Sequence, residues 1–499
     1  MALFMGIDIG TSSVKTLVTD EHGRTLAVAQ QEYDVEKPHP LYHEQDMNII
    51  WEKTKTTIQK VLENITAYEL KGISFSGQMH SLVMIDKNGK VLEKAILWSD
   101  QRSAAETQSV YKKYGEDNFK SITLNALGTG FLWTSLLWVK NNRKNIYEKI
   151  DKVLLPKDYI RYLMCGEIGT DYSDASATLI FDVQKQEWAW QIIDTFGVPR
   201  TLFPECHESY EFAGKVTEHC AKETGLPKGI PVVYGGGDSI MQQLGNGVFG
   251  KNSPLIANIG TSCSVNCAAE QAIYDHKYRV NTFCHAQKNL WFFMGANLCG
   301  GSALKWLKNK ILFMNSYNEM SALAEEVPTG SDGLLFLPYL NGTRSPVNDP
   351  DAQGMFIGLT AGHARSHMIR SVMEGVVFCM YDNYKVIEET GFSTDVIVSS
   401  GGGARSQTFL QMEADIFQKS VKVADNNEQS CLGAAIVAAV GTKTYNNYEE
   451  ACNNMVHWKN IEILPNPNNF AVYEHNYAIY KELYEANKIL FHKNIKHGI

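Results

Sequence analysis

The hexapeptide DIGTSS, residues 8–13, returns near the middle of the chain as NIGTSC, residues 258–263. Each copy follows a short apolar run, and each leads into a segment that we expect to be extended. Self-similarity at a fixed offset is typical of repeated structural units. We therefore predict two domains of related design, spanning residues 1–245 and 246–499. We also expect the helical segment at 470–491 to pack back across the first domain.

The remaining sequence alternates short β-branched runs with amphipathic segments, which is the pattern of an α/β protein. LKGISFSG, residues 70–77, has the composition of a buried strand, and residues 47–64 carry apolar side chains at helical spacing. A chain of 499 residues is too long for a single hydrophobic core. The predicted fold class is thus α/β with two large domains.

The bulk composition restricts the class of partner. The formal net charge is -9, which argues against nucleic acid or an anionic membrane surface as the main partner. No apolar stretch approaches the roughly 18–20 residues that span a bilayer, and the start of the chain lacks the pattern of a secretory signal. The ten cysteines are scattered without a CxxC pair, which favours reduced thiols over disulfides or a zinc site. We expect a cytoplasmic protein.

The first copy of the repeat has the residues of a phosphate site. A strand that ends near Asp8 is followed by a tight hairpin whose backbone N–H groups and hydroxyls can converge on phosphate oxygens. Asp8 can hold Mg²⁺ through water, since hard oxygen ligands suit this cation. An ordinary β-hairpin with small turn residues is the alternative for one copy taken alone. Two opposed hairpins can clamp one polyphosphate, and their residues are Gly10, Thr11, Ser12, Gly260, Thr261 and Ser262.

A second feature is the run VVYGGGD, in which three glycines at residues 235–237 lead from a predicted strand into Asp238. Each glycine has an entropic cost of roughly 0.5–1 kcal/mol relative to alanine. We therefore expect something bulky to lie against the bare backbone, and we predict that the glycines leave room for a substrate beside the Asp238 carboxylate. A loop that is merely rich in glycine is the alternative.

A third glycine cluster, SGGGARS, lies at residues 400–406 between a predicted strand and a predicted helix. A flat backbone with a nearby cation suits an adenine base and its ribose. Glycine turns between a strand and a helix are common, so this cluster is informative only together with the others. The residues assigned to the nucleotide here are Gly401, Gly402, Gly403 and Arg405.

Two segments of the first half carry groups that suit a polyol or sugar. SGQMH, residues 76–80, places an amide, a thioether and an imidazole after a strand, and ILWSDQR, residues 96–102, adds an indole and a carboxylate. Taken singly, the histidine is more typical of a structural residue and the tryptophan of the core. The predicted substrate residues are Gln78, Met79, His80, Trp98 and Asp100, together with Asp238.

Taken together, these segments resemble the FGGY family of carbohydrate kinases over essentially the whole chain. The similarity is carried by DIGTSSVK, GGGD, NIGTS, SGGGARS and FLPYLNGTRSPVNDPDAQGMFIGL (336–359). The resemblance implies two actin-like, ribonuclease-H-like domains with the active site in the cleft between them. It also implies ATP and Mg²⁺ as cofactors, a small-molecule sugar as the second substrate and, by analogy alone, a homodimer.

The resemblance implies roles for individual residues as well. Asp238 is expected to be the general base, and Asp8 is expected to organise Mg²⁺ together with Asp238. The two hairpins are expected to hold the ATP phosphates, with Lys15 beside the first of them. The glycines at 401–403 are expected to lie at the adenosine.

Within the family, SGQMH followed by ILWSDQR is most similar to members that phosphorylate D-xylulose, a ketopentose. Gluconate, ribulose and other ketoses or polyols stay open as substrates, and so does a non-transferring, actin-like ATPase activity. The chain departs from the usual family motifs at Ser81, Ser135, Ser239 and Thr343. Two of these departures, Ser81 and Ser239, stand beside the predicted sugar residues.

Overall fold

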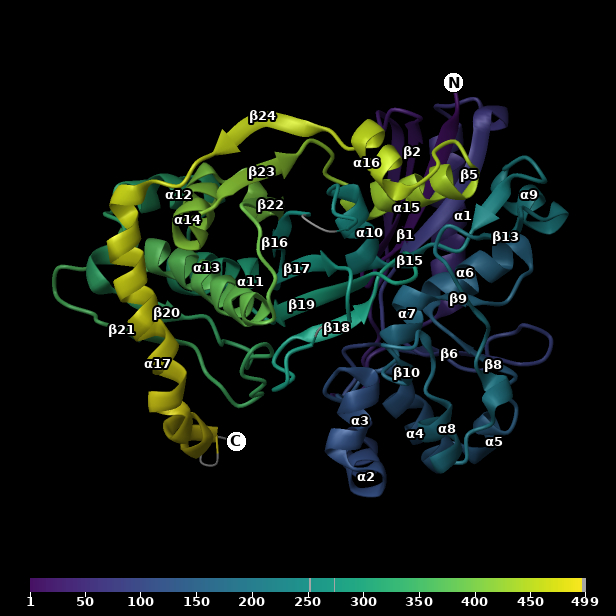
Figure 1. Ribbon diagram of the computed structural model, residues 1–499, viewed down its shortest axis with the longest axis horizontal. Helices are drawn as coiled ribbons and strands as arrows, with labels where there is room; N and C mark the ends of the chain where they lie inside the picture. The colour runs from purple at the N-terminus through teal and green to yellow at the C-terminus, as the bar shows by residue number, and fades with distance from the viewer. Residues whose placement is uncertain (251–252, 273, 496–499) are drawn as a thin grey trace.

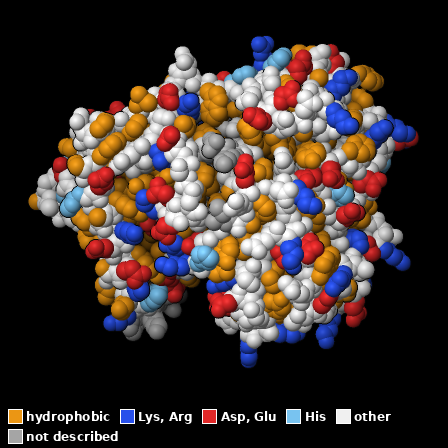
Figure 2. Space-filling model, in the orientation of Figure 1, with side chains coloured by type: hydrophobic (Ala, Val, Ile, Leu, Met, Phe, Trp, Pro, Cys, Tyr) orange, Lys and Arg blue, Asp and Glu red, His pale blue; other side chains and the backbone are white. Residues whose placement is uncertain are grey.

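The computed structural model describes residues 1–250, 253–272 and 274–495. The chain forms two lobes, each built around a seven-stranded mixed sheet with helices against it (Figure 1). In the space-filling view a notch separates the lobes along one edge, and the visible face mixes acidic and basic side chains (Figure 2). Within the described ranges, no helix is both long enough and apolar enough to cross a bilayer.

The first sheet is mixed. The strand β2 (Ser13–Asp20) runs antiparallel to both β1 (Leu3–Ile9) and β3 (Thr25–Glu32), whereas β5 (Leu70–Gly77) and β14 (Pro231–Val233) run parallel to β1. The strand β15 (Gly236–Gly237) also pairs with β5. The order across the sheet is β13 (Phe212–Lys215), β14 (Pro231–Val233), β5 (Leu70–Gly77), β1 (Leu3–Ile9), β2 (Ser13–Asp20) and β3 (Thr25–Glu32).

The second sheet repeats this design. Its order is β18 (Asn281–Cys284), β19 (Trp291–Asn297), β17 (Cys263–Ala269), β16 (Leu255–Ile259), β22 (Val396–Gly401), β23 (Ser420–Ala424) and β24 (Trp458–Ile463). The strand β16 pairs antiparallel with β17 and parallel with β22, as β1 does with β2 and β5. The two copies of the repeat therefore form equivalent hairpins in two sheets of related order.

Among the described residues, five two-stranded ladders lie outside these two sheets. They are β4 (Glu44–Gln45) with β7 (Ala95–Ile96), β6 (Val83–Ile85) with β8 (Lys152–Leu154), β9 (Thr170–Asp171) with β12 (Cys206–His207), β10 (Phe181–Asp182) with β11 (Glu187–Trp188), and β20 (Leu335–Leu337) with β21 (Met355–Ile357).

The helices divide between the two halves of the chain. The first half contains α1 (Met47–Leu62), α2 (Ala104–Tyr114), α3 (Glu116–Thr123), α4 (Leu132–Asn142), α5 (Lys144–Tyr147), α6 (Pro156–Cys165), α7 (Tyr172–Ser176), α8 (Trp190–Thr195), α9 (Glu218–Thr224) and α10 (Asp238–Gly245). The second half contains α11 (Gly301–Trp306), α12 (Tyr317–Glu325), α13 (Arg365–Glu389), α14 (Gln407–Phe417), α15 (Gln429–Gly441), α16 (Tyr448–Met455) and α17 (Phe470–Ile495).

The burial pattern of β1 shows how the sequence indicates the position of the functional site. Every residue of β1 is buried except Asp8, which is partly accessible. Strands covered on both faces read as nearly continuous apolar runs, because neither face meets water. A carboxylate near the end of such a strand is costly to bury unless it has a specific partner or function.

The helix α15 joins the second half of the chain to the first sheet. It packs against α10, β1 and β5, and it is apolar around its whole circumference because all of these surround it. The approach is close: a Cβ on Gly6 would lie 1.9 Å from Cys431 O, and one on Gly433 would lie 1.8 Å from Met241 O. Glycine is therefore required on both sides of this interface.

The last helix does not cross the first lobe, contrary to the sequence prediction. The helix α17 packs against α13, α14 and β20, all in the second half. Its inward face contributes Tyr473, Tyr480, Leu483 and Phe491 to the second hydrophobic core. The apolar face of α17 packs on its neighbours in the second half, which it complements. The helix that packs against the first sheet is α15.

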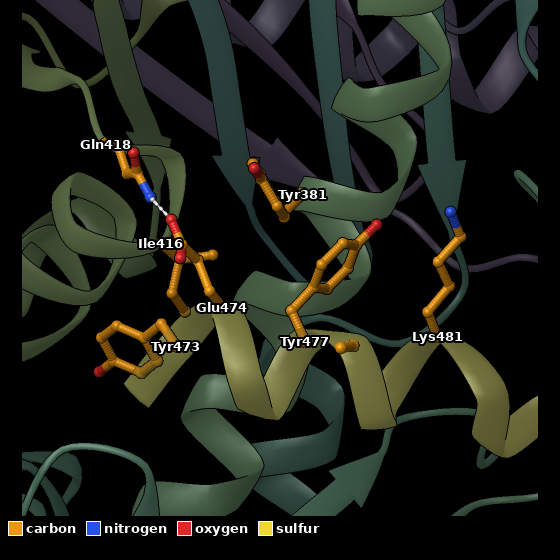
Figure 3. A pocket seen from close by; sticks show the side chains of 8 residues that line it. Tyr381, Ile416, Gln418, Tyr473, Glu474, Tyr477 and Lys481 are labelled. Atoms are coloured by element: carbon orange, nitrogen blue, oxygen red, sulfur yellow. Dashed lines mark hydrogen bonds between the residues drawn. The ribbon is translucent and has the colours of Figure 1, made fainter. Parts of the chain in front are cut away.

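A small hollow of about 270 Å³ lies beside α17, outside the cleft. Figure 3 shows Tyr473 and Tyr477 of α17 on one side of it and Tyr381 of α13 nearby. Gln418 Nε2 donates to Glu474 Oε1 at 2.9 Å across its edge. None of the residues predicted for the functional site lines this hollow.

Candidate functional site

The cleft between the lobes holds a cavity of about 310 Å³, which we call the acceptor cavity. Residues from both lobes line it, so neither half of the chain forms it alone. The first lobe contributes Asp8, Thr11, Gln78, Met79, His80, Trp98, Asp238 and Ser239. The second lobe contributes Asn258, Ser262, Ser264, Met294 and Arg344. The structure therefore brings together residues that were predicted separately for phosphate, metal and sugar.

Two carboxylates face the acceptor cavity, Asp8 from β1 and Asp238 from the first turn of α10. Ser76 Oγ donates to Asp8 Oδ1 at 2.7 Å, and Ser239 Oγ donates to Asp238 Oδ1 at 3.3 Å. Burial raises the pKa of Asp238 to about 7, with a further contribution from the negative charge of Asp8. A carboxylate with a pKa near neutrality is suited to accept a proton during a reaction.

The glycines before Asp238 serve close packing within the protein. Gly235 has φ +77°, and a Cβ there would lie 2.2 Å from Phe75 O. A Cβ on Gly237 would lie 2.8 Å from Met79 Cγ. The prediction that these glycines leave room for a substrate is therefore wrong, because protein atoms already occupy that space. The glycines let β15 lie against β5, and this places Asp238 at the cavity.

A hydrogen-bond network holds the first hairpin against the acceptor cavity. Trp98 Nε1 donates to Thr11 Oγ1 at 2.9 Å, and Thr11 Oγ1 donates to Gln78 Oε1 at 3.3 Å. Gln78 Nε2 donates to Gln45 Oε1 at 2.9 Å, and Gln45 Nε2 donates to Thr11 O at 2.5 Å. Gln78 and Trp98 thus position the hairpin in addition to lining the cavity. Sequence reasoning missed Gln45, which lies in a different segment.

His80 presents a neutral imidazole to the acceptor cavity. Its Nδ1 donates to Ala177 O at 2.6 Å, and its ring centroid lies 4.5 Å from that of Phe131. Burial lowers the pKa of His80 to about 4, so the ring is uncharged near neutral pH. Because Ala177 O can only accept, Nδ1 carries the proton and Nε2 is left as an acceptor. Its φ of 73° is uncommon outside glycine, and such outliers cluster at functional sites.

Asp100 does not reach the acceptor cavity, and its assignment to the substrate is corrected. The side chain is fully buried, and Arg102 Nε donates to Asp100 Oδ1 at 2.9 Å. Arg102 Nη2 donates to Oδ2 of the same carboxylate at 2.8 Å, and the N–H of His43 donates to Oδ2 at 2.7 Å. These bonds occupy the carboxylate with protein donors. The acid and the arginine two residues later form a structural ion pair.

A second cavity, of about 740 Å³, lies within the second lobe, and we call it the nucleotide cavity. The hairpin at 260–262 connects the two spaces: Gly260 and Thr261 line the nucleotide cavity, and Ser262 lines the acceptor cavity. Further lining residues come from α11, α12 and the turn before α14, and the predicted ones among them are Gly402, Gly403 and Arg405. Gly401 is not a lining residue; its φ is +75°, and a Cβ there would lie 2.6 Å from Ile259 O, so the turn requires glycine.

The first hairpin is less open than predicted. In the described part of the chain, Thr11 is the residue of this hairpin that lines the acceptor cavity, whereas Gly10 and Ser12 do not. The carbonyl of Gly10 accepts from Tyr33 Oη at 2.6 Å. Lys15 Nζ lies 2.6 Å from Glu428 Oε2, so it is paired with the second half of the chain.

The four departures from the family motifs have different surroundings. Ser239 lines the acceptor cavity beside the base. Ser81 lies behind it, where its Oγ accepts the N–H of Trp98 at 3.1 Å. Ser135 is fully buried in α4, and Thr343 is buried in the loop before Arg344. Only Ser239 of the four can meet a ligand in this cavity directly.

The sequence analysis did not assign the second-lobe wall of the acceptor cavity. The missed residues include Asn258, Ser264, Met294 and Arg344, which come from β16, β17, β19 and the loop after β20. The first three look like ordinary strand residues in sequence. A signal existed for Arg344, because a cation in the glycine- and proline-flanked stretch GTRSP is typical of a functional loop.

A fully buried charge cluster lies behind the turn that carries Asp238. Lys157 Nζ lies 2.6 Å from Asp158 Oδ1 and 2.8 Å from Asp171 Oδ1. It also lies 3.1 Å from Asp174 Oδ2, and all four side chains are inaccessible to solvent. Burial raises the pKa of Asp174 well above its usual value, against the opposing charge of Lys157. Arg161 Nη1, also fully buried, lies 3.2 Å from Asp158 Oδ1, so two cations compensate three carboxylates, and Lys157 is the one that contacts all three.

The cluster is joined directly to the backbone before the base. Ser173 Oγ donates to Asp171 Oδ2 and accepts the N–H of Gly237 at 3.1 Å. A Cβ on Gly237 would lie 3.2 Å from Asp174 Oδ1. The buried charges thus fix the peptide that precedes Asp238.

The chain is similar to known proteins over almost its whole length. The model of the FGGY family of carbohydrate kinases, N-terminal domain, matches residues 3–245, and that of the C-terminal domain matches residues 255–442. A xylulose kinase from Staphylococcus epidermidis is 36% identical over 94% of both chains. A xylulose kinase from Bacillus subtilis is 34% identical over 91% of both chains. A gluconokinase from Bacillus subtilis is 30% identical, over 89% of this chain and 88% of its own.

Solved structures agree with the sequence relatives. A xylulose kinase from Rhodospirillum rubrum superposes with a TM-score of 0.91 at 27% identity, covering 98% of this chain and 100% of its own. The ligand-bound xylulose kinase from Lactobacillus acidophilus has a TM-score of 0.94 at 23% identity, covering 99% and 100%, and shows the fold alone. With both family domains matched in order, the chain belongs to the FGGY family of carbohydrate kinases.

Proposed function

We propose that this protein transfers the γ-phosphoryl group of ATP to a hydroxyl of the ketopentose D-xylulose, forming D-xylulose 5-phosphate. The observation that carries the proposal is the placement of Asp238 in a cavity that also contains His80 and that meets the nucleotide cavity at one hairpin. Xylulose kinases at 34–36% identity over most of both chains support the choice of sugar.

In the proposed reaction, Asp238 accepts the proton of the attacking hydroxyl and orients it toward the γ-phosphorus. Phosphoryl transfer passes through a loose transition state, so positioning and charge neutralisation contribute more than proton abstraction. The neutral His80 accepts a hydrogen bond from a second sugar hydroxyl at Nε2. We place the domains at residues 1–245 and 246–499, and closure between them would exclude water from the phosphoryl group.

The acceptor cavity contains ligands that fit Mg²⁺. Asp8 and Asp238 both face it, and they lie close enough for the charge of Asp8 to raise the pKa of Asp238. Carboxylate oxygens completed by water are the ligands that this cation prefers. Mg²⁺ held there would neutralise negative charge on the phosphates. We assign Asp8 and Asp238 to it.

The pH dependence of the reaction follows from the pKa of Asp238. Because burial raises this pKa to about 7, the base is increasingly protonated below neutrality in the free protein. We expect kcat/KM for the sugar to rise from about pH 5.5 and to level off above about pH 8, with an inflection near 7. Steady-state rates at subsaturating MgATP and sugar across this range report on the free protein and check the prediction. A profile that is flat between about pH 6 and pH 8 would contradict it.

A sugar panel separates the proposed substrate from its competitors. ATP consumption is measured with D-xylulose, D-ribulose, D-fructose and D-gluconate, and without any sugar. We expect strong stimulation by D-xylulose, with kcat/KM at least about tenfold above that for each other sugar. Gluconate is the second candidate, because a gluconokinase is 30% identical over most of this chain.

The same panel tests the rival from another class. A non-transferring, actin-like ATPase would consume ATP at one rate whether or not a sugar is present. Sugar-independent hydrolysis would therefore overturn the kinase proposal, whereas stimulation by gluconate alone would overturn only the choice of D-xylulose.

A further inference from the structure

Arg344 reaches the acceptor cavity from the second lobe, opposite the first-lobe residues predicted for the sugar. Its side chain lines the acceptor cavity and also an adjoining space of about 530 Å³. That adjoining space has walls from both lobes, including Phe131 and Asn281. Arg344 is thus part of the boundary between the acceptor cavity and this second space.

The guanidinium of Arg344 has unused hydrogen-bonding capacity. Within the described ranges, it makes no ion pair and donates no hydrogen bond, and its nearest recorded partner is the ring of Trp98, whose centroid lies 5.7 Å from Cζ. Arginine side chains carry five N–H donors in a planar fork and no acceptor. By contrast, Arg279 in the adjoining space is held by Asp275 and Glu389. An unpaired fork beside a predicted substrate is therefore available to a ligand.

The backbone that carries Arg344 is firmly held. Asn297 Oδ1 accepts from Thr343 Oγ1 at 2.7 Å and from the N–H of Arg344 at 3.2 Å. Asn297 Nδ2 donates to Ser345 O at 2.5 Å. Thr343 and Asp349 also exchange backbone hydrogen bonds at 2.9 and 3.0 Å. The loop presents the arginine from a fixed position, which reduces the entropic cost of ordering it on a ligand.

The last helix completes this support. Tyr484 Oη and His492 Nε2 both lie 2.8 Å from Asp349 Oδ2. They join the loop to α17, which packs on the second core. The helix α17 was predicted to cross the first lobe. It instead supports the loop that carries Arg344 toward that lobe.

The geometry indicates which end of the acceptor cavity Arg344 occupies. Its guanidinium lies over Trp98, with Cζ 5.7 Å from the ring centroid. Arg344 lines the adjoining space together with Phe131, whose ring centroid lies 4.5 Å from that of His80. Asp8 and Asp238 line the acceptor cavity but not the adjoining space. The guanidinium thus lies at the His80 end, and the two carboxylates mark the end where phosphoryl transfer is proposed.

We propose that Arg344 recognises the end of the sugar remote from the transferred phosphate, by donating two N–H groups to the carbonyl oxygen and the adjacent hydroxyl of a ketose. This assignment rests on the proposed function, because it places the 5-hydroxyl at Asp238. A planar fork matches two neighbouring oxygens better than a single ammonium does. Arg344 is therefore a specificity-determining residue that favours a carbonyl over the hydroxyl of the corresponding polyol.

The test compares D-xylulose with D-arabinitol, in which a hydroxyl replaces the carbonyl at C2. Each compound is measured by kcat/KM or, where it is not turned over, by its inhibition constant. For Arg344→Gln we expect kcat/KM for D-xylulose to fall by about 10- to 100-fold, mainly through KM, and the polyol value to change by less than about threefold. Arg344→Lys should recover only part of the loss, because it restores the charge without the fork.

The matched control is Arg279→Lys, since Arg279 lines only the adjoining space and is held by carboxylates. The ratio of ketose to polyol should not change in this variant. An equal loss for ketose and polyol in Arg344→Gln would overturn the assignment, as would full recovery by lysine. Thermal melting of each variant separates these results from misfolding.

The experiment also distinguishes a failure of the Arg344 assignment from a failure of the proposed function. If the unaltered protein phosphorylates D-gluconate and not D-xylulose, the choice of substrate has failed, and the comparison is repeated with D-gluconate and D-glucitol. Calorimetric titration of the same pairs measures the discrimination without phosphoryl transfer. Loss of discrimination in Arg344→Gln supports recognition of the remote end by Arg344 in either case, whereas the ketose contact itself stands only with D-xylulose; retained discrimination overturns both.

Discussion

Replacing Asp238 by asparagine is expected to lower kcat for sugar phosphorylation by about 10²- to 10⁴-fold, the range typical of losing a general base. The amide keeps the shape of the side chain but cannot accept the hydroxyl proton. The nucleotide cavity is formed by other residues, from Gly260 and Thr261 to α14, so the affinity for ATP measured without Mg²⁺ should change by less than about threefold. Single-turnover kinetics with ATP binding measured separately checks both expectations.

The stability of this variant provides an internal control for folding. The folded-state pKa of Asp238 is raised by burial to about 7, so ionisation is less favourable in the folded than in the unfolded protein. The contribution of Asp238 to stability is then present at low pH and is lost as the pH rises to about 7. Asparagine does not titrate, so its stability relative to the unaltered protein should increase over the same interval.

The neighbouring serine gives the matched comparison for activity. Ser239 Oγ donates to Asp238 Oδ1 at 3.3 Å, which is a long hydrogen bond. Ser239→Ala should lose no more than about tenfold in kcat, because it removes one neutral hydrogen bond and keeps the carboxylate. If Asp238→Asn turns over sugar nearly as fast as Ser239→Ala, Asp238 is not the base.

Replacing Lys157 by methionine is expected to lower the free energy of unfolding by about 3–5 kcal/mol, the typical result of removing one partner of a buried charge pair. The substitution leaves Asp158, Asp171 and Asp174 without their shared cation, in a cluster that solvent does not reach. Methionine has a similar length, so the loss is electrostatic and not a packing defect. Urea unfolding measures it.

The pH dependence identifies the cause of this loss. The charge of Lys157 opposes the effect of burial on the pKa of Asp174, so without Lys157 this pKa rises further, and the folded variant holds a proton there that it loses as the pH increases. The deficit should therefore be smaller near pH 5 than near pH 8. Lys149→Met, at an exposed lysine, should change stability by less than about 0.5 kcal/mol at either pH. A Lys157→Met deficit that does not depend on pH would contradict the electrostatic explanation.

Local patterns were sufficient to predict much of this fold. The repeat at residues 8–13 and 258–263 predicted two related units, and these segments form equivalent hairpins in two sheets of the same design. The expected strand at residues 70–77 is β5, and the expected helix beginning at residue 47 is α1. Such features depend on side-chain period and turn chemistry, which a single sequence displays directly.

Features that depend on long-range packing were not predictable in this way. The glycines before Asp238 did suggest a close approach, but only the structure shows that the approaching atoms belong to β5 and Met79. The placement of α17 depends on which neighbour complements its apolar face, and sequence periodicity does not name that neighbour.

The residues of the candidate site also fall into two groups, those that local motifs predict and those that only the packing of distant segments reveals. Asp8 lies near the end of a strand, His80 follows one and Asp238 begins a helix, all in the first half, where local motifs are informative. Asp100 was wrongly assigned to the substrate because both Asp100 and Arg102 are residue types that can bind a sugar. Only the geometry shows that the two side chains are hydrogen-bonded to each other. Arg344 was missed because its importance comes from lying unpaired opposite residues more than two hundred positions earlier in the chain.

The central claim is that this protein transfers phosphate to a sugar. The most direct measurement is phosphorus NMR of the purified protein with MgATP and D-xylulose, followed until the ATP is consumed. The account predicts one equivalent of a phosphomonoester on the 5-oxygen of D-xylulose for each ADP formed, and no reaction without the sugar. Inorganic phosphate as the only new phosphorus species, released at the same rate with and without any sugar, would contradict it.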